Sequence, residues 1–351
     1  MNVSKTLIKW YHLNHRELPW RSSTDPYIIW LSEIILQQTR VEQGLPYFLR
    51  FVDKYPTISD LANAPEEEVL KIWQGLGYYS RARNLHATSK FVHQHYQGIF
   101  PSEYDQILAL KGIGDYTAAA IASFAYNQPF AVVDGNVFRV LSRLFGESTP
   151  IDTTTGKKLF TELANDLLNK KTPGIHNQAI MEFGATLCRP SSPDCHICPL
   201  NGQCIALREG KIGILPVKAK KTKVSKRYFN YLLVRHKKGI YINKRKQGDI
   251  WEMLYELPLI ETELLENPEI LMRSAIWKSY FTKKQLFLKS VKSYPVYKLS
   301  HQHIFARLFE MEITGEPEPL FANSFIKINE SDAGNYPVPR LIERIFSDHL
   351  G

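Results

Sequence analysis

Four cysteines crowded into one short stretch constrain this chain more than any other feature of its sequence. They are all the cysteines among the 351 residues, spaced as Cys188-x6-Cys195-x2-Cys198-x5-Cys204. Such crowding favours a metal site over disulfides, which would be spread along a secreted chain. Zinc ribbons usually offer two tight Cys-x2-Cys pairs, whereas this stretch has one tight pair with longer arms. The longer arms favour a four-iron, four-sulfur cluster, with zinc and unrelated free cysteines as the alternatives.

The overall composition is that of an ordinary globular protein with a surplus of positive charge. The chain is 44% hydrophobic and 23% charged, with a formal net charge of +9. A polyanion, nucleic acid above all, is the leading class of partner, although such a surplus also serves solubility alone. No apolar run reaches the ~18 residues of a membrane span, and the first residues lack a signal-peptide core. We therefore expect no membrane partner and a cytosolic location, and we also expect a monomer.

The pattern of elements predicts two domains. Up to about residue 205 the chain shows successive amphipathic helical patterns with caps, and the cysteine loop 188–204 closes this all-α domain. Residues 206–227 form a linker that includes the basic run "KAKKTKVSKR". Residues 228–351 contain short alternating stretches such as "YFNYLLVR" and "HIFARLFEMEIT", followed by a last amphipathic helix. We predict an all-α domain followed by a smaller α+β domain.

A glycine turn leads directly into a helix in "LKGIGDYTAAA", residues 110–120. Gly112 and Gly114 would let backbone N–H groups point outward at the start of the next helix, where an anion binds readily. Helix 102–109, this turn and helix 115–126 together predict a helix-hairpin-helix that holds a DNA phosphate. An ordinary turn is the alternative, because a lone Gly-x-Gly is weak evidence.

Two carboxylates stand out among the helical patterns. Glu33 shares a largely apolar helix face with Ile29, Trp30 and Leu36, so it either reaches out to water or is kept protonated by burial as a general acid. Asp134, in "VVDGNVFRV", is fully explained as an N-cap before the helix that begins at about residue 136. Read alone, each has an adequate structural explanation.

Taken together, the motifs resemble a known family. "LSEIILQQTR", "GLGYYSRARNL", "LKGIGDYTAAA", "VVDGNVFRV" and the cysteine run, in this order, resemble the helix-hairpin-helix DNA glycosylases that bear an iron–sulfur cluster. Within them the resemblance is to the A/G-specific adenine glycosylases of the MutY type, and it covers essentially the whole chain. It implies a six-helix barrel module and a cluster module, with DNA and a flipped adenine in the cleft between them. It also strengthens the assignment of a 4Fe-4S cluster to the four cysteines.

The resemblance implies roles for the carboxylates. Glu33 would protonate adenine at N7, Asp134 would stabilise the oxocarbenium-like sugar, electrostatically or as a transient covalent partner, and Asn136 would position the reacting groups. Tyr116 stands where bifunctional endonuclease III-type relatives carry a lysine that attacks the sugar. A phenol cannot form that Schiff base, so a monofunctional enzyme is implied, with the tyrosine hydrogen-bonded to the aspartate. Phe138 stands where some members carry a lysine, which puts crosslinking to DNA in doubt.

DNA contacts are implied in the same way, and flipping a base out of the duplex needs such support. The residues that would line the adenine pocket are Trp20, Arg21 and Gln178, the last being glutamate in some relatives. Those that would meet the opposite base or wedge into the base stack are Gln38, Thr39, Leu76 and Tyr78.

The second domain resembles the family's nudix-like domain, which reads 8-oxoguanine. No acidic nudix box is present, so hydrolysis of nucleoside diphosphates is not expected. Ser300 and His301 match the family's reading loop, in which Leu299 replaces a phenylalanine. The implied substrate is duplex DNA with adenine opposite 8-oxoguanine, or less well opposite guanine. A thymine-glycol-type glycosylase/lyase and a non-catalytic cluster-bearing DNA-binding protein are the alternatives.

Overall fold

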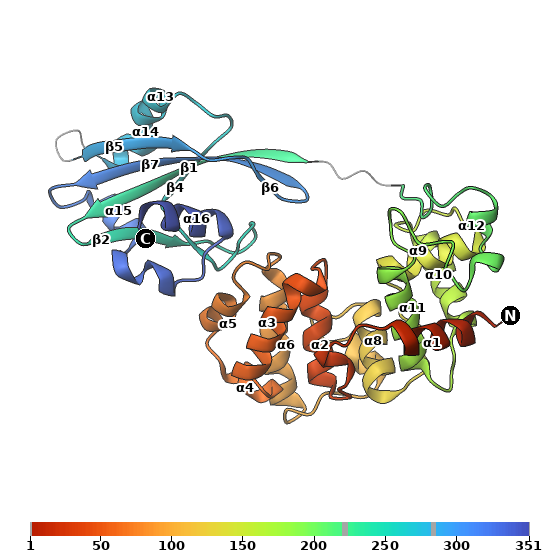
Figure 1. Ribbon diagram of the computed structural model, residues 1–351. Helices are drawn as coiled ribbons and strands as arrows, with labels where there is room; N and C mark the ends of the chain where they lie inside the picture. Colours follow the sequence, from red (N-terminus) through yellow and green to blue (C-terminus); the bar gives the residue numbers. More distant parts are fainter. Residues whose placement is uncertain (1, 220–223, 282–285, 351) are drawn as a thin grey trace. The chain divides into compact units, whose positions relative to one another are not determined.

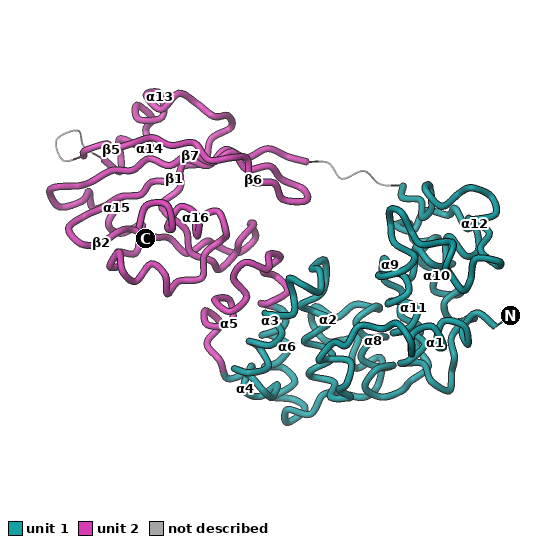
Figure 2. The backbone as a smooth tube through the Cα atoms, viewed as in Figure 1, with its two compact units in different colours: residues 1–63, 84–221 teal, residues 64–83, 222–351 magenta. Residues whose placement is uncertain are grey.

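The structure is a computed structural model that describes residues 2–219, 224–281 and 286–350, so residues 220–223 of the expected linker lie outside the described residues. The chain divides into two compact units, residues 1–63 with 84–221 and residues 64–83 with 222–351 (Figure 2). The segment 64–83 therefore groups with the second unit, whereas the chain on either side of it, 1–63 and 84–221, forms the first. None of the helices in the described part of the chain is long and apolar enough to cross a lipid bilayer.

The first unit is helical, as the sequence predicted (Figure 1). Its elements are α1 (Val3–Asn14), η1 (Pro19–Arg21), α2 (Pro26–Leu36), α3 (Val41–Lys54), α4 (Ile58–Asn63), α6 (Ser80–His95, whose first turn belongs to the second unit), α7 (Tyr104–Leu108), α8 (Asp115–Tyr126), α9 (Gly135–Phe145), α10 (Thr154–Leu167), α11 (Pro173–Thr186), η2 (Asn201–Gln203) and α12 (Ile205–Arg208). Helices α1, α9 and α11 share one buried apolar cluster with α10.

Local capping chemistry sets the ends of the helices that carry the candidate site. The Asp25 side chain accepts a hydrogen bond from the backbone N–H of Tyr27, with Pro26 in the first helical position of α2. Helix α9 begins after Asp134 and ends at Gly146, whose φ of 65° is the left-handed conformation that favours glycine. Because both ends of α9 are fixed in this way, the N-terminus of the helix holds a defined position.

The second unit is built on one mixed sheet. Its elements are α5 (Glu66–Trp73), β1 (Ser225–His236), β2 (Gly239–Lys244), β3 (Tyr255–Glu256), β4 (Leu259–Thr262), α13 (Pro268–Arg273), α14 (Ala275–Tyr280), β5 (Leu286–Ser293), β6 (Tyr297–Lys298), β7 (Gln302–Ile313), α15 (Pro319–Ser324), β8 (Ile326–Asn329), η3 (Glu330–Asn335) and α16 (Arg340–His349). The strand order is β3-β2-β1-β7-β5, and β1 and β7 run parallel over their whole length.

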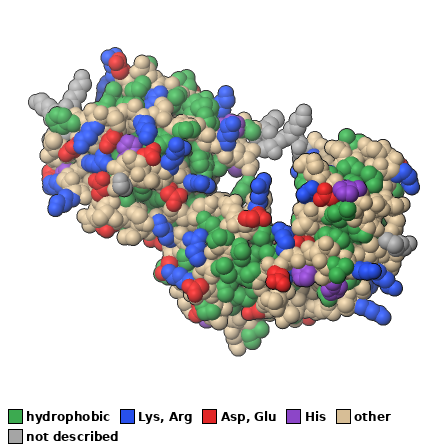
Figure 3. Space-filling model, in the orientation of Figure 1, with side chains coloured by type: hydrophobic (Ala, Val, Ile, Leu, Met, Phe, Trp, Pro, Cys, Tyr) green, Lys and Arg blue, Asp and Glu red, His purple; other side chains and the backbone are tan. Residues whose placement is uncertain are grey.

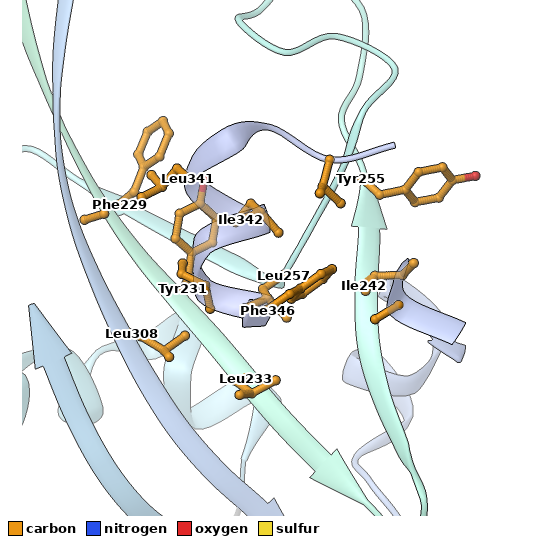
Figure 4. Packing of buried hydrophobic residues seen from close by; sticks show 14 of the residues in the cluster. Phe229, Tyr231, Leu233, Ile242, Tyr255, Leu257, Leu308, Leu341, Ile342 and Phe346 are labelled. Atoms are coloured by element: carbon orange, nitrogen blue, oxygen red, sulfur yellow. The ribbon is translucent and has the colours of Figure 1, made fainter. Parts of the chain in front are cut away.

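Alternate residues of the central strand β1 face two different cores. Phe229, Tyr231 and Leu233 pack with α16 on one face of the sheet, the packing seen in Figure 4. Leu232 and Val234 pack on the other face with side chains from α13, α14 and α15. A strand with apolar residues on both faces is buried on both sides, which explains its nearly continuous hydrophobic run. The predicted fold class, a helical domain followed by an α+β domain, is confirmed.

Candidate active site

Glu33 lies in α2 with its carboxylate enclosed by the fold. Its exposed fraction is only 7%, which rules out the reading in which the side chain reaches out to water. Burial raises the pKa of Glu33 to about 7, helped by the nearby charge of Asp134, while a hydrogen bond from Tyr116 acts in the opposite direction. A carboxyl group with such a pKa is partly protonated at neutral pH and can give up a proton.

Tyr116, in the first turn of α8, hydrogen-bonds to the acid. Its hydroxyl donates to Oε2 of Glu33 over 2.5 Å. The resemblance implied a hydrogen bond to the aspartate, but in this structure the hydroxyl of Tyr116 is hydrogen-bonded to Glu33. Asp134 acts on the tyrosine only through its negative charge. Burial and these two carboxylates raise the pKa of Tyr116 well above its ordinary value. The phenol therefore stays neutral and acts as a hydrogen-bond donor.

Asp134 is the N-cap of α9 and is held by three N–H donors. Its Oδ1 accepts from the backbone N–H groups of Asn136 (2.9 Å) and Val137 (2.8 Å), and its Oδ2 accepts from Nδ2 of Asn136 (2.7 Å). Burial raises the pKa of Asp134, whereas these hydrogen bonds and the charge of Arg139 favour the ionised form. The start of the helix adds further positive potential. The predicted cap is thus present, and both oxygens of the carboxylate are held by hydrogen bonds.

Arg139, one turn further along α9, was not singled out from the sequence. Its guanidinium donates to Oδ1 of Asn136 over 2.8 Å, which turns the amide nitrogen of that side chain toward Asp134. The same guanidinium donates to the carbonyls of Gly184 (2.7 Å) and Cys188 (2.8 Å). An arginine one helical turn beyond "DGN" is the only sequence signal that could have suggested this arrangement.

These groups surround one cavity of about 480 Å³, which we call the carboxylate cavity. Its size is in the range of ligand-binding pockets. Predicted residues that line it are Trp20, Arg21, Glu33, Thr39, Tyr116, Asp134, Asn136 and Gln178. The structure thus brings the predicted acid, its tyrosine, the aspartate and the predicted adenine-pocket residues to the walls of a single cavity.

A buried ion-pair group forms one wall of the carboxylate cavity and was missed by sequence reasoning. Glu182 accepts hydrogen bonds from Arg16 (2.7 Å) and Arg21 (2.6 Å). Burial alone would raise the pKa of Glu182, but the two arginines outweigh it and bring the pKa down to about 2. Beside this pair, the Tyr11 hydroxyl donates to Oε1 of Gln178 over 2.6 Å. Packing of α1 on α11 creates these contacts, so no local motif could reveal them.

The residues predicted to meet the opposite base follow α2 directly. Gln38 has a φ of 55°, and its side chain lines a neighbouring cavity together with Gly114 and Tyr116. Gly112 has a φ of 80°, and a Cβ there would lie 2.7 Å from Cβ of Asn84, so this turn needs glycine. Gly114 is the N-cap of α8 with no side-chain cap, and nothing lies within 4 Å of where its Cβ would be. The start of α8 is therefore open to an approaching group.

The remaining predicted DNA contacts lie together in the second unit. Leu76, Tyr78, Ser300 and His301 all line a cavity of about 320 Å³, which we call the second-unit cavity. The Tyr78 hydroxyl lies 2.5 Å from Oγ of Ser300. Tyr78 is 45% exposed whereas Leu76 is 6% exposed, so of the two expected wedges the tyrosine is the one presented to a partner. Figure 3 shows Lys and Arg side chains on the surface of both units.

The four cysteines line one apolar cavity of the first unit together with Arg143. Arg143 donates to the carbonyls of Arg189 (2.7 Å) and Pro190 (2.9 Å), and it lies 3.5 Å from Sγ of Cys188. None of the cysteines is in a disulfide. Among the described residues, no group of three or more His, Cys, Asp or Glu side chains is arranged to hold a single metal ion. Four free thiols thus lie around one cavity.

Comparison with known proteins identifies the family. Residues 31–166 match the model of the HhH-GPD superfamily of base excision DNA repair proteins, and residues 230–348 match the NUDIX domain model. The chain is 37% identical over 262 residues to the adenine DNA glycosylase of Buchnera aphidicola subsp. Baizongia pistaciae, which covers 72% of each chain. The human adenine DNA glycosylase is 40% identical over 210 residues, or 57% of this chain and 38% of the human protein.

Solved structures of DNA-repair enzymes match part of this chain. A thermostable thymine-DNA glycosylase matches 59% of this chain and 95% of its own, with a TM-score of 0.55 and 30% identity. An endonuclease III in a non-covalent complex with DNA matches with a TM-score of 0.51 and 25% identity, covering 59% of this chain and 94% of its own. The buried acid, the capped aspartate and the two matched domains thus occur in one chain, and this chain belongs to the adenine DNA glycosylases, enzymes of base excision DNA repair.

Proposed function

We propose that the protein hydrolyses the N-glycosidic bond of adenine paired with 8-oxoguanine in duplex DNA, and less efficiently that of adenine paired with guanine. The observation that carries this proposal is a carboxyl group with a pKa of about 7, hydrogen-bonded to a neutral tyrosine, on the wall of the cavity that a second, capped carboxylate also lines. This is the pairing of one neutral and one ionised carboxyl that glycoside chemistry requires.

In the proposed reaction Glu33 gives its proton to N7 of a flipped adenine, which makes the neutral base a leaving group. The bond between N9 and the sugar then breaks, and its electron pair leaves with the base. Asp134 stabilises the positive charge that develops on the sugar, and Asn136 and Arg139 hold its carboxylate in place. Water adds to the sugar and releases a proton, which restores Glu33 and leaves an abasic site.

The absence of an amine at position 116 supports a monofunctional enzyme. The phenol of Tyr116 donates a hydrogen bond to Glu33 and cannot form a Schiff base with the sugar. The strand should therefore remain intact at the abasic site. A thymine-glycol-type lyase would nick it without added alkali, and a non-catalytic protein would release no base.

Reading of the opposite base is proposed for the second-unit cavity. 8-Oxoguanine has an N–H where guanine has an acceptor nitrogen, and a serine hydroxyl can accept from that N–H. Ser300 lies on the cavity wall beside the exposed Tyr78, and His301 lines the same cavity. A good base contact supplies roughly 1–3 kcal/mol of discrimination.

Alanine substitution of the two reading residues tests this role. The Ser300→Ala/His301→Ala variant should lose about 5- to 150-fold of its preference for the 8-oxoguanine pair over the guanine pair, which is the range a good base contact supplies. Excision from the guanine pair at saturating enzyme should change little, since Glu33 and Asp134 belong to the other unit. If the double variant kept the wild-type preference for the 8-oxoguanine pair over the guanine pair, recognition of the lesion would belong to Gln38 and Thr39 instead.

A 4Fe-4S cluster is proposed for the four cysteines, which would hold it by their thiolates. Burial raises the pKa of the Cys198 thiol to about 11, so a bound metal centre is needed to keep this ligand deprotonated. With four protein ligands the cluster leaves no iron open to substrate, and its proposed role is to fix the loop 188–204. We further propose that the protein works as a monomer on chromosomal DNA in the bacterial cytosol.

A further inference from the structure

A turn that the proposed function leaves unused forms one wall of the second-unit cavity. Asp249, Ile250 and Trp251 line this cavity together with Tyr78 and Ser300. The turn is unusual in its backbone: Trp251 has a φ of 58° and Met253 a φ of 65°. Bulky residues in the left-handed region are costly and persist where the surrounding structure holds them, often at functional sites.

The indole of Trp251 is held by aromatic and cationic neighbours. Its ring meets the ring of Tyr297 edge-on at 5.8 Å and that of Phe229 at 6.2 Å. The Arg245 guanidinium lies 6.0 Å from the indole centroid. Trp251 and Leu299 both pack on the core beneath the sheet while they line the cavity. A large flat ring therefore stands with one part anchored in the core and another part in the cavity.

Ion pairs and hydrogen bonds hold the turn on both sides of Trp251. Before it, Arg227 bonds the Asp249 carboxylate at 2.5 and 2.8 Å, and Nε of Arg245 donates to the carbonyl of Ile250 over 2.8 Å. Arg245 also contacts the Asp249 carboxylate.

After Trp251, the neighbouring residue Glu252 is bound by Arg83 from helix α6. Arg83 donates to the Glu252 carbonyl over 2.9 Å, and its guanidinium lies 3.2 Å from Oε2 of the same residue. Both side chains are about one-fifth exposed, at 20% and 19%. Such a half-buried pair restricts side-chain and backbone position more than an exposed pair does. The turn is thus fixed to the same helix that follows Tyr78.

We propose that Trp251 is a further specificity-determining residue, which provides an aromatic surface against the base opposite the target adenine, and that Arg83 and Glu252 are positioning residues for it. The inference rests on the proposed function, because it assumes that the second-unit cavity reads that base. Ser300 and His301 provide the polar contacts of this cavity, and the exposed ring of Tyr78 is already assigned to the wedge in the base stack. The ring of Trp251, on the same cavity, is then left to stack on the face of the opposite base.

The first test compares Trp251→Leu, Trp251→Phe and the wild type as full-length proteins. Single-turnover excision and duplex affinity are measured for the 8-oxoguanine:adenine and guanine:adenine pairs. Trp251→Leu should lower the preference ratio by at most the roughly 5- to 150-fold that the Ser300 contact supplies, because a base that no longer stacks is not held against that hydroxyl. Trp251→Phe keeps an aromatic ring and should stay within about threefold of the wild type. The matched control is Tyr280→Leu, a half-buried aromatic residue packed on the other face of the sheet, which should leave the ratio unchanged.

The second test uses the ion pair. Arg83→Glu and Glu252→Arg should each lower the preference ratio, and the double exchange should restore part of it. Excision from the guanine pair at saturating enzyme should stay within about threefold. The control is the exchange of Arg235 and Glu310, a pair of the same unit with side chains 17% and 18% exposed. If Arg83 instead contacts a phosphate, the double exchange will give no rescue and both substrates will bind more weakly, which overturns the positioning role.

Two results separate failure of this inference from failure of the proposed function. A wild type that prefers the 8-oxoguanine pair, with a folded Trp251→Leu variant of equal preference, overturns the inference alone. A wild type with no preference between the two pairs removes the proposed reading function and the inference with it.

Discussion

Among the residues of the carboxylate cavity, Glu33 has the clearest chemical signature, a buried carboxyl with a pKa raised to about 7. If its carboxyl is the general acid, Glu33→Gln should bind duplex DNA normally and lose excision by at least ~100-fold, the usual scale of general-acid catalysis. Glu42→Gln is the matched control, since Glu42 lines the same cavity and is exposed. Single-turnover rates for the two variants provide the comparison, and near-normal excision by Glu33→Gln would reject the assignment.

The pH dependence of excision follows from the same group. If the protonated form of Glu33 is the active one, as proposed, the single-turnover rate should fall as the pH rises through about 7, the pKa of this carboxyl. The hydrogen bond from Tyr116 lowers this pKa, so Tyr116→Phe should move the midpoint of the profile to higher pH. A midpoint that stays in place, or moves to lower pH, would contradict the coupling of the two side chains.

Glu33 should also make the free energy of unfolding depend on pH. Its pKa is raised from 4.5 to about 7 by folding, so the folded protein binds more protons in this interval and loses stability as the pH rises through it. The full effect is about 3 kcal/mol. Glu33→Gln removes the buried charge, so thermal unfolding should show the variant more stable than the wild type at pH 8 and similar to it near pH 4.5. An equal difference at both pH values would mean that the carboxyl is not desolvated.

At the scale of the element, the N-cap of α9 combines an observed structural role with a proposed catalytic one. Asn is as good an N-cap as Asp, so Asp134→Asn should keep the melting temperature close to that of the wild type. The substitution removes the negative charge that is proposed to stabilise the sugar cation, and excision should fall by at least ~100-fold, as expected for lost electrostatic stabilisation. Calorimetry and single-turnover excision on the same preparation would separate the two roles. Retained excision in Asp134→Asn would leave the aspartate as a cap only.

The elements were predictable where local chemistry decides them. Helices α8 and α9 lie where the glycine turn and the Asp134 cap indicated, to within one residue. Strand β5 was not predicted, because its exposed, lysine-containing sequence pairs with β7 through a bulge that only the sheet imposes. The tyrosine at 116 was predicted near the site, but its bond to Glu33 depends on how α8 packs against α2 and could not be read from spacing.

The whole molecule shows what sequence reasoning on separate segments leaves out. Tyr11 reaches Gln178, and Arg16 reaches Glu182, because α1 and the residues just after it pack on α11, more than 160 residues away in the chain. Segment 64–83 groups with the second unit through contacts such as that of Glu67 with Lys244 (2.8 Å) and Tyr255 (2.6 Å). The resemblance provided the roles of the residues, whereas the structure provides the partners that tune and position them.

The cysteine loop gives a prediction for the purified protein as a whole. Four thiols around one cavity should bind a cubane cluster, so anaerobically purified protein should be brown and contain about four irons. Metal analysis and the visible spectrum would check this. Stoichiometric zinc without visible absorption would assign the site to zinc instead.

The proposed reaction removes adenine opposite 8-oxoguanine and leaves the strand uncut. The most direct measurement is a single-turnover reaction on a duplex with one 8-oxoguanine:adenine pair, in which free adenine is quantified and the strand is examined with and without alkali. We expect one adenine to be released per duplex and the strand to break only after alkali is added. Strand scission without alkali, or no release of adenine by protein that binds the duplex, would contradict it.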